Sequence, residues 1–275
     1  MLERIKGQGS LTVVGTGISI SGQMTLLTES VLKNADIVLA VVTQSALINL
    51  KKLNSNTQCL RDLYDVNTSR LVTYQQMQQR IVDEVVSGKR VVAAFYGHPG
   101  VFVNPSHKAI TELRNLGYSA QMLPGISAED CLVADLGLDP SRHGCQSYEA
   151  TQFLFRRYTI DPHMLQIIWQ IGSIAEFNHP KDKTDHPGLA VLRDQLLKVY
   201  PAKHKVIIYE AATIPLVAPR IDEIPLDELG DIVPKAISTL VVPALGLPEF
   251  DTETMAKFGL TPDLFIQKLS VSNAV

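Results

Sequence analysis

A loop at residues 95–103, Phe-Tyr-Gly-His-Pro-Gly-Val-Phe-Val, places a phenol and an imidazole on either side of a glycine. It follows residues 89–94, an apolar run typical of a buried parallel strand, and precedes a predicted helix. Open α/β sheets bind ligands at such loops, at the carboxyl ends of their strands. Gly97 and Gly100 allow the backbone to turn sharply and approach a ligand. An ordinary tight loop is the alternative, but the two polar rings favour a ligand site.

Arg70 and Tyr74 form a second pair of interest because they are four residues apart. Thr68 or Ser69 is a plausible N-cap for a helix that runs to about Val86, and this helix would carry both side chains on one face. The alternative is a solvated first helical turn that takes no part in binding.

Residues 124–128, Pro-Gly-Ile-Ser-Ala, lead into another predicted helix, with Ser127 as its N-cap. Glu129 and Asp130 lie in its first turn, where acidic side chains are favourable. The backbone N–H groups at such a helix start are suited to bind a ligand carboxylate or hydroxyl.

A glycine turn also follows the first predicted strand. Gly15 and Gly17 resemble half of a dinucleotide-binding fingerprint, but Ile20 stands where the third glycine is required. We therefore reject dinucleotide binding.

Two predicted domains position these residues. In the first, residues 1–140, the order β-α-β-α-α-β-α-β-α predicts a doubly wound parallel sheet. Its strands are predicted at residues 10–19, 36–42, 89–94 and 118–123, and its helices at 23–35, 44–53, 68–86, 104–116 and from 128. The second, residues 141–247, is predicted to be a mixed α/β domain, with strands at 146–153, 166–172, 205–210 and 236–242 and a helix at 189–199. Residues 248–275 are predicted to form an appendage with a helix at 262–269.

The composition excludes several classes of protein. The net charge of −3 over 275 residues gives no support to a general nucleic-acid or membrane-surface binder. The three cysteines, Cys59, Cys131 and Cys145, lack metal-ligand spacing and are expected to be reduced thiols, and the scattered histidines form no ligand set. No apolar run approaches a membrane span, and the N-terminus lacks the apolar core of a signal peptide. These features predict a cytoplasmic protein without a metal.

The chain resembles the tetrapyrrole methylase family, whose members use S-adenosylmethionine, over roughly residues 10–245. The resemblance rests on four motifs in the family's order: Val14-Gly15-Thr16-Gly17 followed by Leu26-Leu27-Thr28, the Gly-x-Pro-Gly of the central loop, residues 124–128, and Ile208-Tyr209-Glu210-Ala211-Ala212-Thr213. It implies a two-domain α/β fold of the tetrapyrrole methylase kind.

Residues 96–103 resemble one branch of this family most closely, the borosin peptide α-N-methyltransferases. This branch methylates backbone amides of a ribosomally made peptide, and it uses an arginine and tyrosines ahead of the loop, to which Tyr64, Arg70 and Tyr74 correspond. Several members carry their substrate as an apolar C-terminal tail, whereas residues 267–275 here, Gln-Lys-Leu-Ser-Val-Ser-Asn-Ala-Val, contain no such segment. The resemblance therefore predicts a split form that binds a separate precursor peptide.

The resemblance implies catalytic roles for Arg70, Tyr74, Tyr64 and Tyr96. An amide nitrogen is a poor nucleophile because its lone pair is delocalised, so its methylation requires loss of the N–H proton. A phenol is a suitable base if an adjacent guanidinium lowers its pKa, and Arg70 beside Tyr74 supplies that pair. Arg70 is also suited to hold the developing imidate oxygen.

The resemblance further implies that S-adenosylmethionine binds between the domains and leaves as S-adenosylhomocysteine. Its expected contacts are Tyr96, His98, Val101, Phe102, Ser127 and Ala128 from the first domain, and Gln170, Ala211, Ser238 and Thr239 from the second. We also expect a homodimer in which the appendage, or the region of residues 64–74, covers the partner's cleft.

Other functions on the same fold stay open. The substrate could be a tetrapyrrole, a modified histidine on a protein, or rRNA ribose. The net charge does not favour RNA, and a tetrapyrrole enzyme has no evident use for the arginine and tyrosines. The protein could also bind S-adenosylmethionine without catalysis, and accumulation of S-adenosylhomocysteine with a candidate peptide would separate that alternative.

Overall fold

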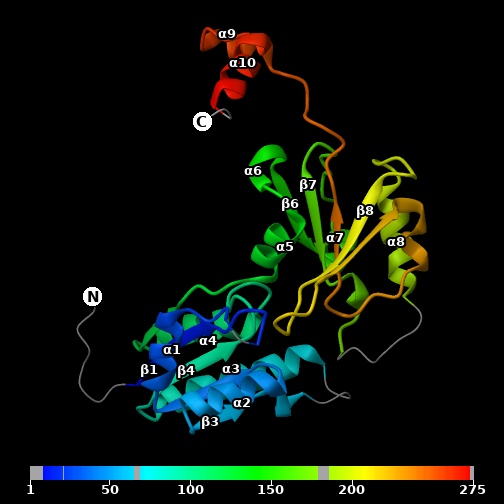
Figure 1. The fold of residues 1–275 in the computed structure, drawn as a ribbon. Helices are drawn as coiled ribbons and strands as arrows, with labels where there is room; N and C mark the ends of the chain where they lie inside the picture. The colour runs from blue at the N-terminus through cyan, green and yellow to red at the C-terminus, as the bar shows by residue number, and fades with distance from the viewer. Residues whose placement is uncertain (1–8, 21, 65–68, 179–185, 273–275) are drawn as a thin grey trace.

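Two five-stranded sheets form the body of the protein. The computed structural model describes residues 9–20, 22–64, 69–178 and 186–272 (Figure 1). The first sheet is wholly parallel, with the strand order β3-β2-β4-β1-β5. Its strands are β1 (Ser10–Gly15), β2 (Ile37–Val41), β3 (Thr57–Cys59), β4 (Arg90–Phe95) and β5 (Ser119–Met122).

Helices cover both faces of this sheet because its central strands are apolar on both sides. In β4, Val91 and Ala93 pack in one core, and Val92 and Ala94 pack in the other. The first core includes α3 (Arg70–Val86) and α4 (Asn104–Asn115), and the second includes α1 (Leu26–Lys33) and α2 (Gln44–Leu53). The predicted doubly wound parallel domain is confirmed.

The second sheet is mixed, as predicted. Its order is β6-β7-β10-β8-β9, in which β6 and β7 are parallel and the remaining pairs are antiparallel. The strands are β6 (Cys145–Glu149), β7 (Leu165–Trp169), β8 (Lys205–Glu210), β9 (Arg220–Pro225) and β10 (Thr239–Val242). One face packs against α7 (Ala150–Phe155), α8 (Pro187–Leu196) and the 3₁₀ helix η3 (Leu226–Asp231).

Helix α5 (Ala128–Leu136) packs on the other face of the second sheet, although it lies before the predicted boundary at residue 140. Leu132 is fully buried among side chains of β7, β8 and β10. Tyr209 on β8 donates a hydrogen bond of 2.7 Å from its hydroxyl to Asp135 Oδ2. This packing favours a boundary before α5 and thus differs from the predicted one. A short helix, α6 (Pro140–His143), follows.

Several predicted elements have different bounds in the structure. The strand expected at residues 146–153 ends at Glu149, whose carboxylate accepts hydrogen bonds from the backbone N–H groups of Thr151 and Gln152 and so starts α7. The sequence analysis also missed β3 and the polar edge strand β9, together with the 3₁₀ helices η1 (Arg61–Leu63) and η2 (Ile171–Ser173). Most of the polar segment at residues 177–188 lies outside the described residues.

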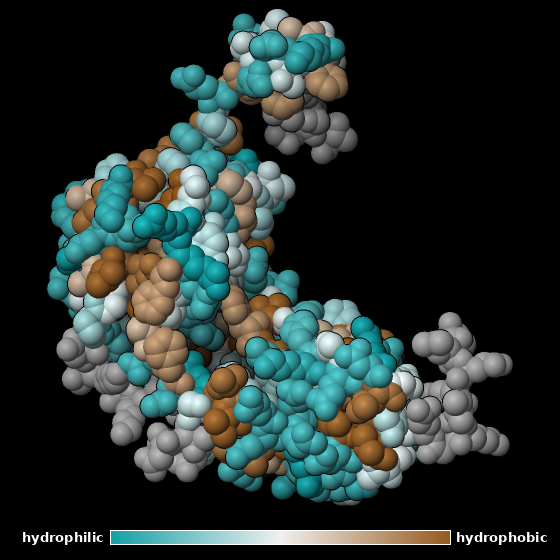
Figure 2. Space-filling view, turned by 180° about the vertical axis from the view of Figure 1, so that it is seen from behind, coloured by the Kyte–Doolittle hydropathy of each residue, from teal (hydrophilic) through white to brown (hydrophobic). Residues whose placement is uncertain are grey.

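The C-terminal tail, predicted as an appendage with one helix, contains two helices, α9 (Thr252–Lys257) and α10 (Pro262–Ser272). Within the tail, the rings of Phe250 and Phe265 contact each other, with centroids 5.8 Å apart. Figure 2 shows a broad concavity bounded by the tail, the second domain and the first domain. Among the described residues, no helix is long and apolar enough to cross a membrane.

Candidate functional site

Three sequence motifs meet at the carboxyl edge of the first sheet, because β1 lies between β4 and β5. Gly15, Gly97 and Gly125 stand at the ends of these strands with their backbones in contact. A Cβ atom on Gly125 would lie 3.0 Å from Gly15 Cα and 3.1 Å from Gly97 O, which is too close for an unstrained side chain. Gly97 N also donates a hydrogen bond of 2.8 Å to Gly17 O. Close backbone packing therefore explains one glycine in each of two motifs, Gly15 and Gly125, which approach the backbone of Gly97.

The central loop is held rigidly by its own polar groups. Gly100 N donates to His98 Nδ1 at 3.0 Å, so this ring nitrogen is an acceptor. Ser106 Oγ lies 2.7 Å from both Pro99 O and Val103 O. Phe102 has a φ of 56°, a left-handed conformation that is costly for a residue with a Cβ. Such strain persists only where surrounding structure enforces it, and it is common at ligand sites.

A pocket opens between this loop and the second sheet. Its lining contains seven of the ten predicted cofactor residues together with others from both domains: Ile18, Tyr96, Gly97, His98, Val101, Phe102, Val103, Ser127, Ala128, Glu129, Trp169, Gln170 and Ile237. The rings of Phe102 and Trp169 approach across the domain junction, with centroids 6.1 Å apart. Gln170, the next residue, also has a left-handed φ, of 61°. Two strained residues from different domains thus line one pocket.

Ser127 lines the pocket and, as predicted, is the N-cap of α5. Its Oγ accepts a hydrogen bond from Asp130 N, and its own N–H donates to Asp130 Oδ2, which forms a complete capping box. Sequence reasoning missed Glu129, Trp169 and Ile237 as lining residues. Burial, followed by the nearby Asp130 charge, raises the pKa of Glu129. The only tryptophan of the chain, within the strand predicted at residues 166–172, was a usable signal.

The three other predicted cofactor residues, Ala211, Ser238 and Thr239, are not in this lining. Ser238 and Thr239 are buried, and Ser238 Oγ donates a hydrogen bond of 2.6 Å to Glu210 Oε1. The structure therefore directs Ser238 to an internal carboxylate. Their role in cofactor binding stays a prediction.

Glu210 is the centre of a compact charged group, here termed the Glu210 cluster and formed by Glu210, Arg220, Lys235 and Ser238. Arg220 Nη1 lies 2.9 Å from Glu210 Oε1, and Lys235 Nζ lies 2.6 Å from Oε2. Burial alone would raise the pKa of Glu210, but hydrogen bonds from Lys235, Ser238 and Arg220 outweigh it and leave the pKa below its ordinary value. The cluster anchors the segment that carries Ile237 into the pocket.

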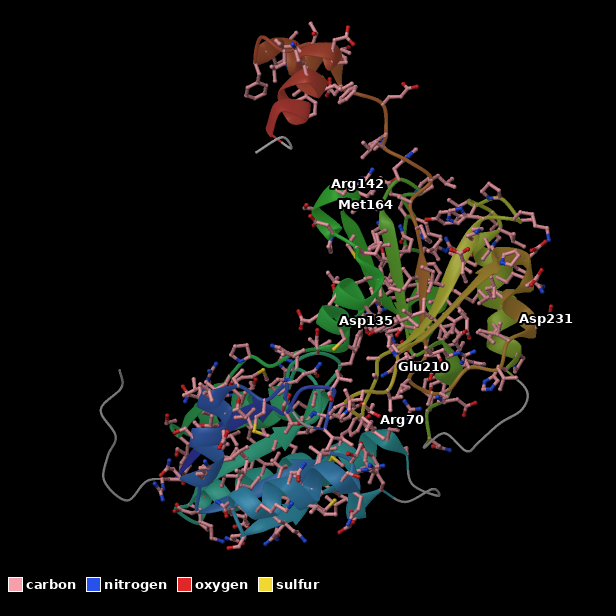
Figure 3. The ribbon with its side chains drawn as sticks, in the orientation of Figure 1. Arg70, Asp135, Arg142, Met164, Glu210 and Asp231 are labelled. Carbon is pink, nitrogen blue, oxygen red and sulfur yellow. The ribbon has the colours of Figure 1, made fainter. Side chains whose placement is uncertain are left out.

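The predicted catalytic residues gather beside the pocket as a second group, here termed the phenol group: Tyr64, Arg70, Tyr74 and Tyr96. Arg70 begins α3 directly after the N-cap Ser69. Its backbone N–H donates to Phe177 O at 3.2 Å, and its Nε donates to Asn178 O at 2.8 Å. The guanidinium is therefore oriented by a segment that follows η2 in the second domain. Figure 3 shows Arg70 and Glu210 at the domain junction, one on each domain.

One donor of the phenol group has no partner. Arg70 Nη2 is buried and makes no hydrogen bond within the described part of the chain. A buried guanidinium N–H without an acceptor is costly, and such groups are rare unless a ligand or water completes them. An acceptor oxygen from a ligand would satisfy this donor.

Two other phenols of the group, Tyr64 and Tyr96, have raised pKa values. Burial raises the pKa of Tyr64 above its ordinary value, as do the neighbouring Tyr74 and Tyr96, while Arg61 and Arg70 oppose the change. Burial followed by Tyr74 likewise raises the pKa of Tyr96, against the same two arginines, although the residue is half exposed. The arginines act in the predicted direction, but desolvation outweighs them at both residues. Tyr64 and Tyr96 are therefore neutral phenols at neutral pH.

The described residues contain no group of three or more His, Cys, Asp or Glu side chains arranged to hold a metal ion. Burial, with a smaller effect from Glu129, raises the pKa of Cys145 to about 11, so this thiol is protonated at neutral pH.

Comparison with known proteins identifies the family. The family model described as Tetrapyrrole (Corrin/Porphyrin) Methylases matches residues 10–225. The chain belongs to the tetrapyrrole methylase family. Among solved tetrapyrrole methylase structures, uroporphyrin-III-C-methyltransferase from Thermus thermophilus aligns with a TM-score of 0.60 and 18% identity, covering 88% of this chain and 98% of that one. A cobalt precorrin-4 methyltransferase aligns with a TM-score of 0.61 and 15% identity, covering 85% and 94%. These alignments confirm the predicted fold.

Relatives of higher identity are borosin proteins, as the sequence resemblance predicts. A "methyltransferase/ribosomally synthesized type III borosin cyclic peptide precursor" of Anomoporia bombycina is 42% identical over 257 residues, which are 92% of this chain and 30% of that protein. The corresponding omphalotin A precursor protein of Omphalotus olearius is 44% identical over 226 residues, 81% of this chain and 54% of that protein. The chain thus spans about a third to a half of these relatives. Because their names join methyltransferase and precursor, the separate precursor stays a prediction.

Proposed function

We propose that this chain is an S-adenosylmethionine-dependent methyltransferase that N-methylates backbone amides of a peptide. The observation that carries the proposal is the buried Arg70 Nη2, which has no partner among the described residues and lies among three tyrosines beside a pocket lined by both domains. The similarity to borosin methyltransferase and precursor proteins supports a peptide as the substrate class.

The pocket residues fit the cofactor. Phe102 and Trp169 offer aromatic surface suited to a nucleobase. His98, Glu129 and Gln170 line the same pocket, and their polar groups are suited to hydrogen-bond the hydroxyl, amino and carboxylate groups of the cofactor. When bound, S-adenosylmethionine supplies an electrophilic methyl group carried on a positively charged sulfur.

The chain's own residues would then activate the amide. Arg70 Nη2 donates a hydrogen bond to the amide oxygen and stabilises the negative charge that develops there as the N–H proton leaves. Tyr74, as the phenolate, would accept that proton directly or through a water molecule and pass it on to solvent. Since Tyr64 and Tyr96 keep their protons, we assign them hydrogen-bond donation and orientation of the peptide. Closure of the cleft would exclude water and strengthen each of these interactions.

Two measurements test this function. Isothermal titration with S-adenosylhomocysteine tests the cofactor site. Intact mass and fragmentation spectra of synthetic peptides rich in Gly, Ala, Val and Ile, supplied free or joined to the C-terminus of the chain, test the reaction. We expect mass steps of one methyl group, located on backbone nitrogens. Methylation only of side chains or of a tetrapyrrole, or cofactor binding without any transfer, would overturn the proposal.

We also propose that the precursor is a separate peptide and that the enzyme is a homodimer, which binds it as a heteromeric complex. Exposed apolar side chains of the tail, among them Phe258 and Ile266, support an intermolecular role for α9 and α10. Faster turnover of free than of fused peptide would support the separate precursor. A monomer with full activity in light scattering would exclude the dimer.

A further inference from the structure

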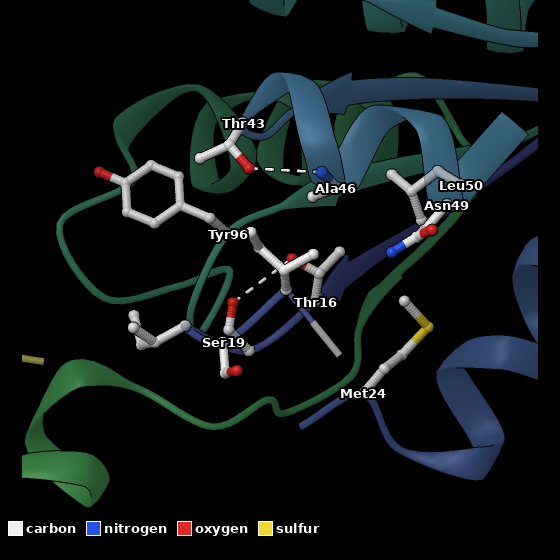
Figure 4. Close-up of a pocket in the computed structure, with 11 residues that line it drawn as sticks. Thr16, Ser19, Met24, Thr43, Ala46, Asn49, Leu50 and Tyr96 are labelled. Atoms are coloured by element: carbon white, nitrogen blue, oxygen red, sulfur yellow. Dashed lines mark hydrogen bonds between the residues drawn. The ribbon is translucent and has the colours of Figure 1, made fainter. Parts of the chain in front are cut away.

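A second, smaller cavity adjoins the interdomain pocket, and Tyr96 and Ile18 line both (Figure 4). The rest of its wall comes from three segments of the first domain: the loop after β1, the approach to α1, and the first turns of α2. The lining residues beyond the shared pair are Thr16, Gly17, Ser19, Ile20, Met24, Thr43, Ala46, Asn49 and Leu50. The cavity therefore adjoins the proposed reaction centre at Tyr96.

The wall of this cavity is held in place by hydrogen bonds. Ile18 N and Ser19 N both donate to Gln23 Oε1, each at 2.8 Å. Thr16 Oγ1 donates to Phe95 O at 3.3 Å, which ties the loop to the residue before Tyr96. Helix α2 is fixed by its N-cap Thr43, and its Leu50 is buried in the core. The cavity is thus formed before any ligand binds.

Its size and chemistry suit a small apolar group. The volume is about 30 Å³, above the roughly 10–15 Å³ that a cavity needs to hold one water-sized group, so a methyl group fits without movement. None of its lining side chains is charged, and the apolar ones include Met24, Ala46 and Leu50. The carboxamide of Asn49 lies at the wall (Figure 4) and is suited to hydrogen-bond a peptide backbone.

We propose that this cavity is a side-chain subsite of the peptide site, which selects a small apolar residue next to the methylated amide. The inference rests on the proposed function, because the amide must lie at Tyr96. A peptide whose amide meets Tyr96 from the cofactor side would place a flanking side chain at the mouth of the cavity. An alanine methyl fills the space, whereas a phenylalanine ring cannot enter it without displacing the wall.

The test measures kcat/KM for matched peptides with Gly, Ala, Val or Phe at each position flanking a single methylated amide. We expect Ala to be preferred and Phe to fall by about 10- to 200-fold at one flanking position, the range for misfit in an apolar pocket. Ala46→Leu should fill the cavity and remove the preference for Ala over Gly. Met24→Ala should enlarge it and raise the relative rate with Val and Phe.

Ser45→Leu is the matched control, because Ser45 is exposed on the same helical turn and does not line the cavity. This variant should keep the wild-type preference. Thermal unfolding and titration with S-adenosylhomocysteine confirm that each variant is folded. Equal rates for all flanking residues, or a preference unchanged by Ala46→Leu and Met24→Ala, would overturn the subsite but leave backbone methylation standing. Failure to methylate any peptide would instead overturn the proposed function and the subsite with it.

Discussion

The phenol group and the Glu210 cluster both bury charge at the domain junction, but they satisfy it differently. Both carboxylate oxygens of Glu210 have partners at 2.6–2.9 Å. Arg70, in contrast, uses Nε on a backbone carbonyl and leaves Nη2 without an acceptor among the described residues. A network in which every buried polar group has a partner stabilises a fold, whereas a buried donor without an acceptor is suited to bind a ligand. The comparison therefore separates a structural charge from one that we propose is held ready for the substrate.

Replacement of Arg70 gives the largest expected effect. Arg70→Ala removes the donor proposed for the amide oxygen, and we expect peptide methylation to fall by at least about 10²–10³-fold. Affinity for S-adenosylhomocysteine should stay near that of the wild type. Arg70→Lys should not restore the rate, because an ammonium lacks the planar fork of the guanidinium.

The control for this variant is Arg80→Ala on the same helix, where the exposed Arg80 side chain pairs with the buried Glu84 at 2.8 Å. Its methylation rate should be close to wild type. Near wild-type methylation by Arg70→Ala would remove the distinction between the two charged groups.

Tyr74→Phe tests the proton acceptor, since it keeps the ring and removes only the phenol oxygen. We expect a rate loss of about 10²–10⁴-fold in single-turnover assays with unchanged cofactor binding. Tyr118→Phe, which alters a phenol packed against the same core, serves as its control. Combined with Arg70→Ala, the loss should be far from additive because the two residues act on one amide. Additive losses would argue for independent roles.

Glu210→Gln should affect stability more than chemistry. The carboxylate is 5% exposed, and loss of its charge leaves Lys235 and Arg220 with a weaker partner. We expect the free energy of unfolding to fall by about 1–3 kcal/mol in urea. Asp222→Asn is the matched control, because Asp222 pairs with the same arginine at a half-exposed site and should cost below about 1 kcal/mol. An unchanged free energy of unfolding in Glu210→Gln would show that the Glu210 cluster does not stabilise the fold.

The pH dependence of unfolding gives the smallest effect in this comparison. The pKa of Glu210 in the folded state lies below its ordinary value of 4.5. Its contribution is therefore complete above about pH 4.5 and is lost as the pH falls through the folded-state pKa. The free energy of unfolding, measured from neutral pH down to pH 3, should fall less steeply in Glu210→Gln than in the wild type. Parallel curves would contradict the lowered pKa.

The sequence alone determined the local structure that carries the site. Ser127 was predicted as an N-cap and Ser69 as one of two candidates with Thr68, and both serine side chains accept the expected backbone hydrogen bonds. The apolar runs at β2 and β4 predicted strands buried on both faces, which is why the doubly wound sheet was predicted correctly. Caps and two-sided apolar strands depend on neighbours within a few residues, so they are readable from the chain. The edge strand β9 was missed because its polar residues lack that signal.

Only the tertiary structure decided which hydrogen-bond partners and how much burial the side chains of the site have. Arg70 is oriented by the carbonyls of Phe177 and Asn178, more than 100 residues away, and no local pattern encodes that contact. Ser238 turns to Glu210 and away from the pocket for a similar reason. Burial, which is a property of the packed domains, raises the pKa of Tyr64 and Tyr96 although two arginines stand nearby. Desolvation and long-range hydrogen bonds exist only once the two sheets are in place, and they decide which residues stay open to a ligand.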